Sequence, residues 1–380
     1  MSLKPKPNTI LSPFLILLSL VSTGGCGGKS SNSVPPPQNR EFLYVGNETT
    51  ISVLQIDSSG KLQELPSSPF TAPNDAAPVI ADPQSRFLIL GAYPSLFPAA
   101  IESSHLLSFA SNTKFAMGYP LIDPRGRFFF DAADLGGKFT SSTPIHVYSI
   151  GANLSFPEVP GSPFEPGILP AVTDPEGKFI FGFGVDAAQN VNAIVTIQIA
   201  DTGTLTTVNT LPVAFNADYT DVFGHVHPSG QFLYVTNYSV QNYQYALTVY
   251  KIGATGTLAK TAFEPNFGLA GLGFVGFNPA GTFVYAQHCS SAACSLDTLS
   301  VDQSTGAINT TPLFSLPGWW NLKGFDRSGA RLFAVTPESE CNLGVSDVLT
   351  VFDVSMTGQL HPTSTLKFGS CPPSGLLVVQ

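Results

Sequence analysis

Short hydrophobic runs recur along the whole chain, and most of them follow a turn sequence. The clearest copy is HPSGQFLYVTN at residues 227–237, where a Pro-Ser-Gly turn precedes the strand formers Phe232, Leu233, Tyr234 and Val235. Related copies are DPQSRFLIL from Asp82, DPRGRFFF from Asp123, DPEGKFIF from Asp174, NPAGTFVYAQ from Asn278 and DRSGARLFAV from Asp326. REFLYVGN from Arg40 is a seventh copy of the strand without its turn. The pattern predicts a repeated strand-turn-strand unit.

Two further hydrophobic runs follow each turn, such as ALTVYKI from Ala246 and then ATGTLAKT from Ala254. The six turn residues are 41 to 53 residues apart. That spacing suits four-stranded propeller blades better than the shorter repeats of solenoids. The segment before each turn, such as LPAVTDP from Leu169, is the expected innermost strand.

The first copy has no such segment before it, whereas the chain ends in an unpartnered apolar strand, SGLLVVQ from Ser374. We therefore predict an all-β, seven-bladed β-propeller of four-stranded antiparallel blades over residues 41–380, closed by the C-terminal strand pairing beside Phe42. Residues 82–122 are poorly patterned, and the stretch LGAYPSLFPAAIESS stands where a clean strand is expected.

The N-terminal segment has the layout of an export signal. Residues 1–25 carry Lys4 and Lys6, then an apolar run too short for a permanent membrane span. Cys26 follows small residues, as at a bacterial lipoprotein cleavage site; the alternative is an ordinary secretory signal cut nearby. Residues 26–40 are rich in Gly, Ser and Pro and are predicted to form a flexible tether. We therefore expect an exported, lipid-anchored protein of the cell envelope, in the periplasm or at the outer surface.

Charge narrows the choice of partners. Removing residues 1–25 takes away two lysines and no acid, so the formal charge falls from −9 to −11. Such a surface repels phosphate backbones, so we expect no nucleic-acid partner. Glycan, peptide and small-molecule ligands stay open, and we expect a monomer.

The repeat DPxG(K/R)F(L/I)(Y/F), with the segments LPSSPF from Leu65 and VPGSPF from Val159, resembles a known family. The similarity is to seven-bladed propellers of the YVTN-repeat and lactonase superfamily, which includes 6-phosphogluconolactonase-like and carboxymuconate-cyclase-like proteins. It extends over essentially all of residues 41–380. The resemblance implies the propeller fold, whereas propellers host many unrelated functions.

One family segment differs here. Lactonases carry a stretch like GPRHxxFHPxGKFxYVxNE, whose Arg and His would lie over the central pocket and bind a carboxylated lactone. The matching stretch is DVFGHVHPSGQFLYVTNY, with Val222 and Phe223 at the Arg and His positions and Tyr238 at the Glu. Two function classes follow. The first is a binding module without chemistry; the second is a lactone hydrolase or cycloisomerase with an altered pocket.

His225 and His227 alternate along a predicted strand, a spacing that could supply two metal ligands. We favour a structural role, in which His227 replaces the turn aspartate of other blades and His225 fills an inner-strand position. No metal site and no cofactor are therefore expected.

Four cysteines follow Cys26, and an even set in an exported protein favours disulfides. We predict the pairs Cys289–Cys294 and Cys341–Cys371; a zinc site is the alternative, although the spacing fits no familiar zinc module. All four are placed in loops on one face of the ring.

Long loops are predicted on that same face, because five segments between strands exceed what a hairpin needs. They are residues 131–144, 184–192, 237–245, 287–295 and 336–347. Binding sites concentrate on such loops. The candidate ligand-binding residues are His225, Tyr238, Tyr243, Tyr245, Trp319 and Asp221. Trp320 is expected to fill a seam between blades instead.

Overall fold

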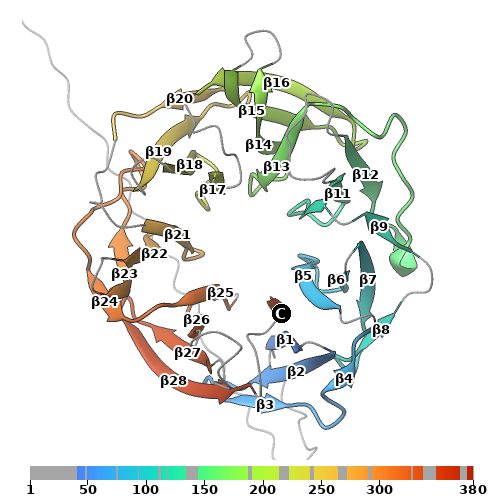
Figure 1. Ribbon diagram of the computed structural model, residues 1–380, viewed down its shortest axis with the longest axis vertical. Coiled ribbons are helices and arrows are strands. Elements are labelled where there is room, and N and C mark those ends of the chain that lie inside the picture. Colours follow the sequence, from blue (N-terminus) through green and yellow to red (C-terminus); the bar gives the residue numbers. More distant parts are fainter. Residues whose placement is uncertain are drawn as a thin grey trace, which may run out of the picture. The chain divides into compact units, whose positions relative to one another are not determined.

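The computed structural model describes residues 41–379 except for 48, 74–75, 93, 110–112, 117, 134–143, 187–190, 214–221, 240–243, 264–271, 290–292, 327, 337–347 and 369–374. The described strands belong to the unit Asn39–Gln380. Within it, seven antiparallel sheets form a ring of blades around a central channel (Figure 1). The predicted all-β, seven-bladed propeller is confirmed.

The first three blades contain the least regular sheets. Blade 1 consists of β29 (Gly375–Val379), β1 (Glu41–Asn47), β2 (Thr50–Ile56), β3 (Leu62–Glu64) and β4 (Phe70–Thr71). Blade 2 consists of β5 (Ala77–Ala81), β6 (Phe87–Ala92), β7 (Ser95–Ile101), β8 (Leu107–Phe109) and β9 (Phe115–Ala116). Blade 3 consists of β10 (Gly118–Ile122), β11 (Phe128–Ala133) and β12 (Ile145–Ser149). A short 3₁₀ turn, η2 (Ala152–Leu154), follows β12.

The other four blades each contain four strands in sequence order from the channel outward. Blade 4 has β13 (Ile168–Thr173), β14 (Phe179–Asp186), β15 (Val191–Ile199) and β16 (Leu205–Pro212). Blade 5 has β17 (Val222–Val226), β18 (Phe232–Ser239), β19 (Gln244–Ile252) and β20 (Leu258–Lys260). Blade 6 has β21 (Leu272–Phe277), β22 (Phe283–Cys289), β23 (Cys294–Ser300) and β24 (Phe314–Pro317). Blade 7 has β25 (Asn321–Phe325), β26 (Arg331–Thr336), β27 (Val348–Val354) and β28 (Leu360–Lys367).

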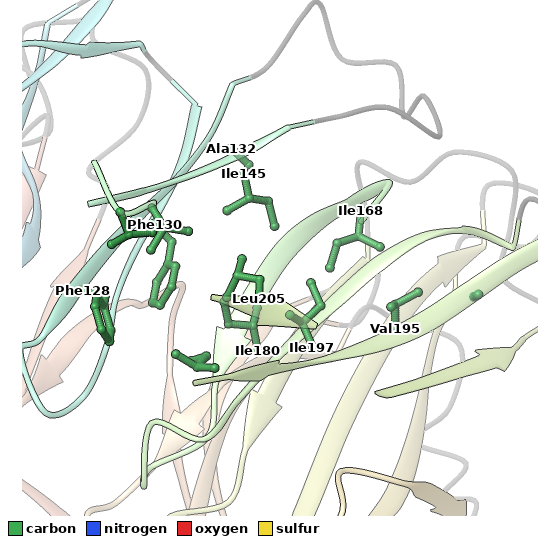
Figure 2. Packing of buried hydrophobic residues seen from close by; sticks show 13 residues of the cluster. Phe128, Phe130, Ala132, Ile145, Ile168, Ile180, Val195, Ile197 and Leu205 are labelled. Atoms are coloured by element: carbon green, nitrogen blue, oxygen red, sulfur yellow. The ribbon is translucent and has the colours of Figure 1, made fainter. Parts of the chain in front are cut away.

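The hydrophobic core is divided among the blade interfaces. The described buried residues form seven clusters, and each cluster joins two neighbouring blades. Between blades 3 and 4, for example, Phe130 and Ile145 pack with Ile180 and Ile197 (Figure 2). Because every sheet is covered on both faces by its neighbours, a chain of this length is stabilised without one large core.

The C-terminal strand closes the ring as predicted. In blade 1, β29 pairs antiparallel with β1, with Phe42 opposite Val379 and Val45 opposite Leu376. The innermost strand of the first blade is therefore supplied by the last strand of the chain, which leaves no open edge at the seam.

Blade 2 is more regular than its sequence indicates. The stretch expected to be irregular forms the hairpin β6–β7, in which Pro98 lies opposite Ile89. On its outer side β7 pairs with β9 at Ser95 and Leu96 and with β8 from Ala99 onward. Pro98 falls between these two pairings, where its missing N–H is not needed.

Blade 3 has an irregular outer edge in place of a fourth strand. Its sheet contains three strands, and two isolated bridges follow, joining Ile145 to Phe164 and Tyr148 to Glu158. The segment VPGSPF lies at this edge, where the Ser162 hydroxyl accepts a 2.9 Å hydrogen bond from the Val147 N–H. In blade 1 the Ser68 hydroxyl accepts a 2.7 Å hydrogen bond from the Val53 N–H. Both copies of the motif therefore hydrogen-bond to a strand at the outer edge of a sheet.

Three of the five predicted long loops are wrong. Strands β14 and β15 continue to Asp186 and Val191, β18 and β19 to Ser239 and Gln244, and β22 and β23 to Cys289 and Cys294. Polar and aromatic residues in these segments hide the strand pattern, whereas the backbone ladder continues through them. Residues 134–143 and 337–347, which make up most of the other two predicted loops, lie outside the described residues.

Candidate functional site

A cavity of about 440 Å³ opens in the wall of the central channel. It is built by the inner strands of four consecutive blades, β5, β10, β13 and β17, together with Phe183 of β14. Its lining comprises Val79, Gly118, Tyr119, Pro120, Leu121, Leu169, Pro170, Ala171, Phe183, Val222, Phe223, Gly224 and His225. Such a volume is typical of small-molecule sites.

Large apolar side chains face this cavity while they are still accessible to solvent. Phe223 is 51% exposed, Tyr119 41% and Val79 40%. They are three of the seven large hydrophobic residues that are exposed in the described part of the chain. Apolar surface left open inside a concave site is a common mark of ligand binding.

The inner strands position Tyr119 and Phe223 by simple alternation, whereas Val79 is the extra residue of a β-bulge between Pro78 and Ile80. Tyr119 and Phe223 each lie four residues before the turn residue of their blade, Asp123 and His227. In β17, Phe223 and His225 point to one side of the strand and Gly224 to the other. A Cβ atom on Gly224 would come within 3.2 Å of the Phe183 ring, so the glycine lets that ring approach the cavity.

His225 is the one histidine of the lining. It touches the space of the cavity, but protein surrounds it, and this burial lowers its pKa to about 4. At neutral pH the imidazole is therefore uncharged, with one nitrogen able to donate a hydrogen bond and the other able to accept one. A group with so low a pKa is a weak base, and at neutral pH hardly any of it is in the protonated form that could give up a proton.

His227 is confirmed as a replacement for the turn aspartate. Its Nε2 lies 2.9 Å from the Gly281 carbonyl, which can only accept, so Nε2 carries the proton. Its Nδ1 accepts from the Ser229 N–H at 3.1 Å. Both ring nitrogens are therefore used within the protein. In the described residues, no cluster of three or more His, Cys, Asp or Glu side chains is arranged to hold a metal ion.

Of the other predicted ligand-binding residues, Trp319 is the one whose side chain the structure describes. Trp319 is 53% exposed, but it lies between β24 and β25 and is not part of the cavity lining. Tyr238 and Tyr245 lie opposite each other in β18 and β19. Tyr243 and Asp221 fall outside the described residues.

The predicted Cys289–Cys294 disulfide is present and joins the paired ends of β22 and β23. Next to it, the buried Gln287 amide accepts from the Trp320 N–H at 2.9 Å and donates to the Gly318 carbonyl at 3.2 Å. Trp320 packs on Phe352 of blade 7, so it fills a seam between blades as predicted. Cys26, Cys341 and Cys371 fall outside the described residues.

The two exposed aromatic residues of the cavity were not predicted as ligand-binding residues. Tyr119 was not singled out, and Phe223 was noted only as a departure from the family pattern. Alignment of the repeats on their turn residues would have found both, because they occupy the same inner-strand position.

The fold is a seven-bladed propeller, and an apolar cavity opens in the wall of its channel. Residues 174–316 match a family described as "Lactonase, 7-bladed beta-propeller". The resemblance to lactonase propellers that the repeats indicated is thereby confirmed. No match was found among curated proteins.

Solved structures support the same fold. A protein from Bacteroides uniformis, provisionally assigned as a 6-phosphogluconolactonase, is 15% identical, with 90% of this chain and 100% of that chain covered and a TM-score of 0.64. The periplasmic gluconolactonase of Pseudomonas aeruginosa is 17% identical, with 90% and 99% covered and a TM-score of 0.63. A functionally unknown protein from Desulfotomaculum acetoxidans is 14% identical, with 89% and 98% covered and a TM-score of 0.59.

Proposed function

We propose that this protein is a binding propeller that holds a small ligand with an apolar or aromatic body in the channel cavity. The observation that carries the proposal is the group of exposed apolar side chains, Phe223, Tyr119 and Val79, inside a cavity of about 440 Å³. Stacking on the two rings and burial against the aliphatic wall would supply most of the affinity.

Turnover of a lactone is less well supported by the same residues. Hydrolysis needs a donor for the developing oxyanion and a positioned base. Val222 and Phe223 occupy the positions where the resembled family has its basic pair. The histidine that does line the cavity has its pKa lowered to about 4, which suits a neutral hydrogen-bonding group better than a proton carrier.

The test is a titration with a neutral fluorescent naphthalene, N-phenyl-1-naphthylamine, against wild type and Phe223→Asp. Because Phe223 is half exposed, the substitution should leave the fold intact while it places a charge in the apolar wall. We expect at least about a tenfold loss of affinity, from the lost ring contacts and area. Trp319→Ala is the matched control, since it removes an equally exposed aromatic outside the cavity.

The competing enzymatic function is assayed in parallel with glucono-δ-lactone. The binding proposal predicts hydrolysis no faster than in buffer and equal probe affinity for wild type and Trp319→Ala. If the wild type hydrolyses the lactone efficiently and His225→Ala abolishes that activity, the binding proposal is wrong. The protein would then be a lactone hydrolase or cycloisomerase that uses an altered pocket. The binding proposal would also be overturned if Phe223→Asp bound the probe with the same affinity as wild type.

We further propose that the protein is exported and held at the cell envelope by lipid on Cys26, on the strength of the N-terminal sequence. Among the described residues, no helix is long and apolar enough to cross a membrane. Several acyl chains on one cysteine are sufficient for stable anchoring. Detergent-phase partitioning of wild type but not of Cys26→Ser supports the proposal; equal partitioning of both contradicts it.

A further inference from the structure

One aromatic residue of the cavity lining comes from a different layer of its blade. The strands of blades 4 and 5 follow one another from the channel outward, so β14 lies one strand farther from the channel than β13 and β17 (Figure 1). Phe183 belongs to β14, whereas the rest of the described lining comes from inner strands. The cavity therefore reaches past the inner strands to this ring, in the seam between blades 4 and 5.

A glycine on the facing strand leaves this ring uncovered. Gly224 of β17 also lines the cavity, and a Cβ atom there would lie 3.2 Å from Cζ of Phe183 and 3.5 Å from a methyl group of Val172. The first of these distances is shorter than an ordinary contact between carbon atoms, so even an alanine would press on the ring. The missing side chain at Gly224 thus keeps the seam open to the cavity.

The ring is also part of the hydrophobic core between these two blades. Phe183 is only 4% exposed, and Phe183, Val222 and Ala171 belong both to the cavity lining and to the core cluster that joins blades 4 and 5. A ring packed in this way resists displacement by a ligand, because close-packed interiors adjust to added volume only at a cost in free energy. The cavity therefore ends on a firm wall at this seam.

We propose that Phe183 limits the length of the ligand, whose apolar body enters the seam beside Gly224 and ends at this ring. The proposal rests on the binding function above and adds the residue that selects among ligands of that class. A body one ring longer would have to displace packed core side chains, which costs more than its additional contacts return. The site thus selects short ring systems over longer ones of the same chemistry.

The test compares two fluorescent probes that are uncharged at pH 7 and differ by one fused ring, 2-naphthol and 2-hydroxyanthracene. Both are titrated into wild type and Phe183→Ala. Removing the ring of Phe183 extends the cavity into the seam, and a void lined by apolar side chains accepts an apolar ligand. We expect the affinity for the three-ring probe, relative to that for the two-ring probe, to rise about tenfold in Phe183→Ala.

The matched control is Phe181→Ala. It removes a buried ring from the same strand and the same core cluster, but that ring is not part of the described cavity lining. The ratio of the two affinities should stay at the wild-type value. If circular dichroism shows that Phe183→Ala does not fold, Phe183→Leu replaces it; this variant removes less volume and should raise the ratio about threefold.

A double-variant cycle tests the contact between the glycine and the ring. The methyl group of Gly224→Ala presses on Phe183 and narrows the seam, so this variant should weaken both probes. In the Phe183→Ala background the same methyl group has room, and the loss should be smaller. An equal loss in both backgrounds would contradict a seam that is shaped by these two residues.

The outcomes separate the two proposals. Suppose that Phe223→Asp weakens 2-naphthol, whereas the affinity ratio of Phe183→Ala equals that of wild type or rises no more than in Phe181→Ala. The length limit at Phe183 is then wrong, and the binding function stands. If Phe223→Asp leaves the affinity for 2-naphthol unchanged, the binding function itself fails.

Discussion

At the residue scale, the turns of blades 2, 3 and 5 are each tied to the next blade through a glycine carbonyl. Arg86 donates to Gly126 at 2.9 Å and Arg127 to Gly177 at 2.9 Å, and both arginines also pair with the turn aspartate of their own blade. Blade 5 has Gln231 in place of that arginine, and there His227 donates to Gly281 itself. An Asp–Arg pair in blades 2 and 3 and a single histidine in blade 5 thus make the same kind of bridge to the next blade.

This equivalence gives a direct prediction for His227→Asp. The variant loses the buried bridge to Gly281 and places a carboxylate near a carbonyl, so we expect it to lose about 1–3 kcal/mol of stability. The double variant His227→Asp with Gln231→Arg rebuilds the pair found in blades 2 and 3 and should recover most of that loss. Urea denaturation of the three proteins checks this; a double variant no more stable than His227→Asp alone would contradict it.

Asp131 gives a pH-dependent prediction. Its side chain is buried opposite His146, its Oδ1 has no hydrogen-bond partner among the described residues, and burial raises its pKa to about 6 despite the attraction of His146. Because the folded-state pKa exceeds the unfolded value of 3.8, stability is lost as pH rises from about 4 through 6. Asp131→Asn removes that loss, so its gain over wild type should be larger at pH 8 than at pH 4 by about 1–3 kcal/mol. Equal gains at both pH values in chemical denaturation would argue against it.

The element scale shows what the sequence could and could not predict. Strand-turn-strand units follow from DPxGxF repeats because the turn residues and strand formers are adjacent in the chain. The sequence predicts too short a strand where a long loop was expected. In the predicted loop 237–245, Tyr238 and Tyr245 still pair with each other and extend β18 and β19, although the residues next to them are polar. The cavity was missed for a different reason: it depends on which inner strands lie side by side and on bulges at Val79 and Ala171, which no local pattern marks.

One element-scale prediction remains for the cysteines that lie outside the described residues. Cys341 and Cys371 are expected to pair, closing a loop of about 30 residues that should stabilise the fold by roughly 3–4 kcal/mol on the chain-entropy model. Peptide mapping of protein expressed in the periplasm, without reduction, should find both Cys289–Cys294 and Cys341–Cys371. Free thiols at Cys341 and Cys371, or a crossed pairing with Cys289, would refute this.

At the scale of the whole molecule, the ring depends on its last strand. Removing Ser374–Gln380 deletes β29 and leaves β1 without its inner neighbour, although Phe42, Leu43, Tyr44 and Val45 of β1 are buried. Five lost strand pairings and the newly exposed apolar surface would exceed about 5 kcal/mol, a large part of the stability of a typical domain. We expect the truncated protein to melt far below wild type in calorimetry. A matched deletion of seven residues within residues 27–40 should leave the melting temperature unchanged, and a truncated protein that melts with wild type would refute ring closure as the source of stability.

The whole-molecule arrangement also decides where a ligand can be held. Inner strands from four blades meet at one cavity, whereas Trp319 lies between blades 6 and 7 and outside that lining. The position of a bound ligand therefore shows whether it occupies the channel cavity or lies at Trp319, in the connection between β24 and β25, whatever its affinity.

The most direct test is the position of a bound apolar ligand in a crystal. Crystals soaked with 1-bromonaphthalene would be measured at the bromine absorption edge, so that the anomalous signal locates the ligand without interpretation of weak density. We predict a bromine peak within the channel cavity, in contact with Phe223 or Tyr119, which Phe223→Asp crystals lack. A peak found at Trp319 and not in the channel, or a channel peak that persists unchanged in Phe223→Asp, would contradict a binding site built on this apolar wall.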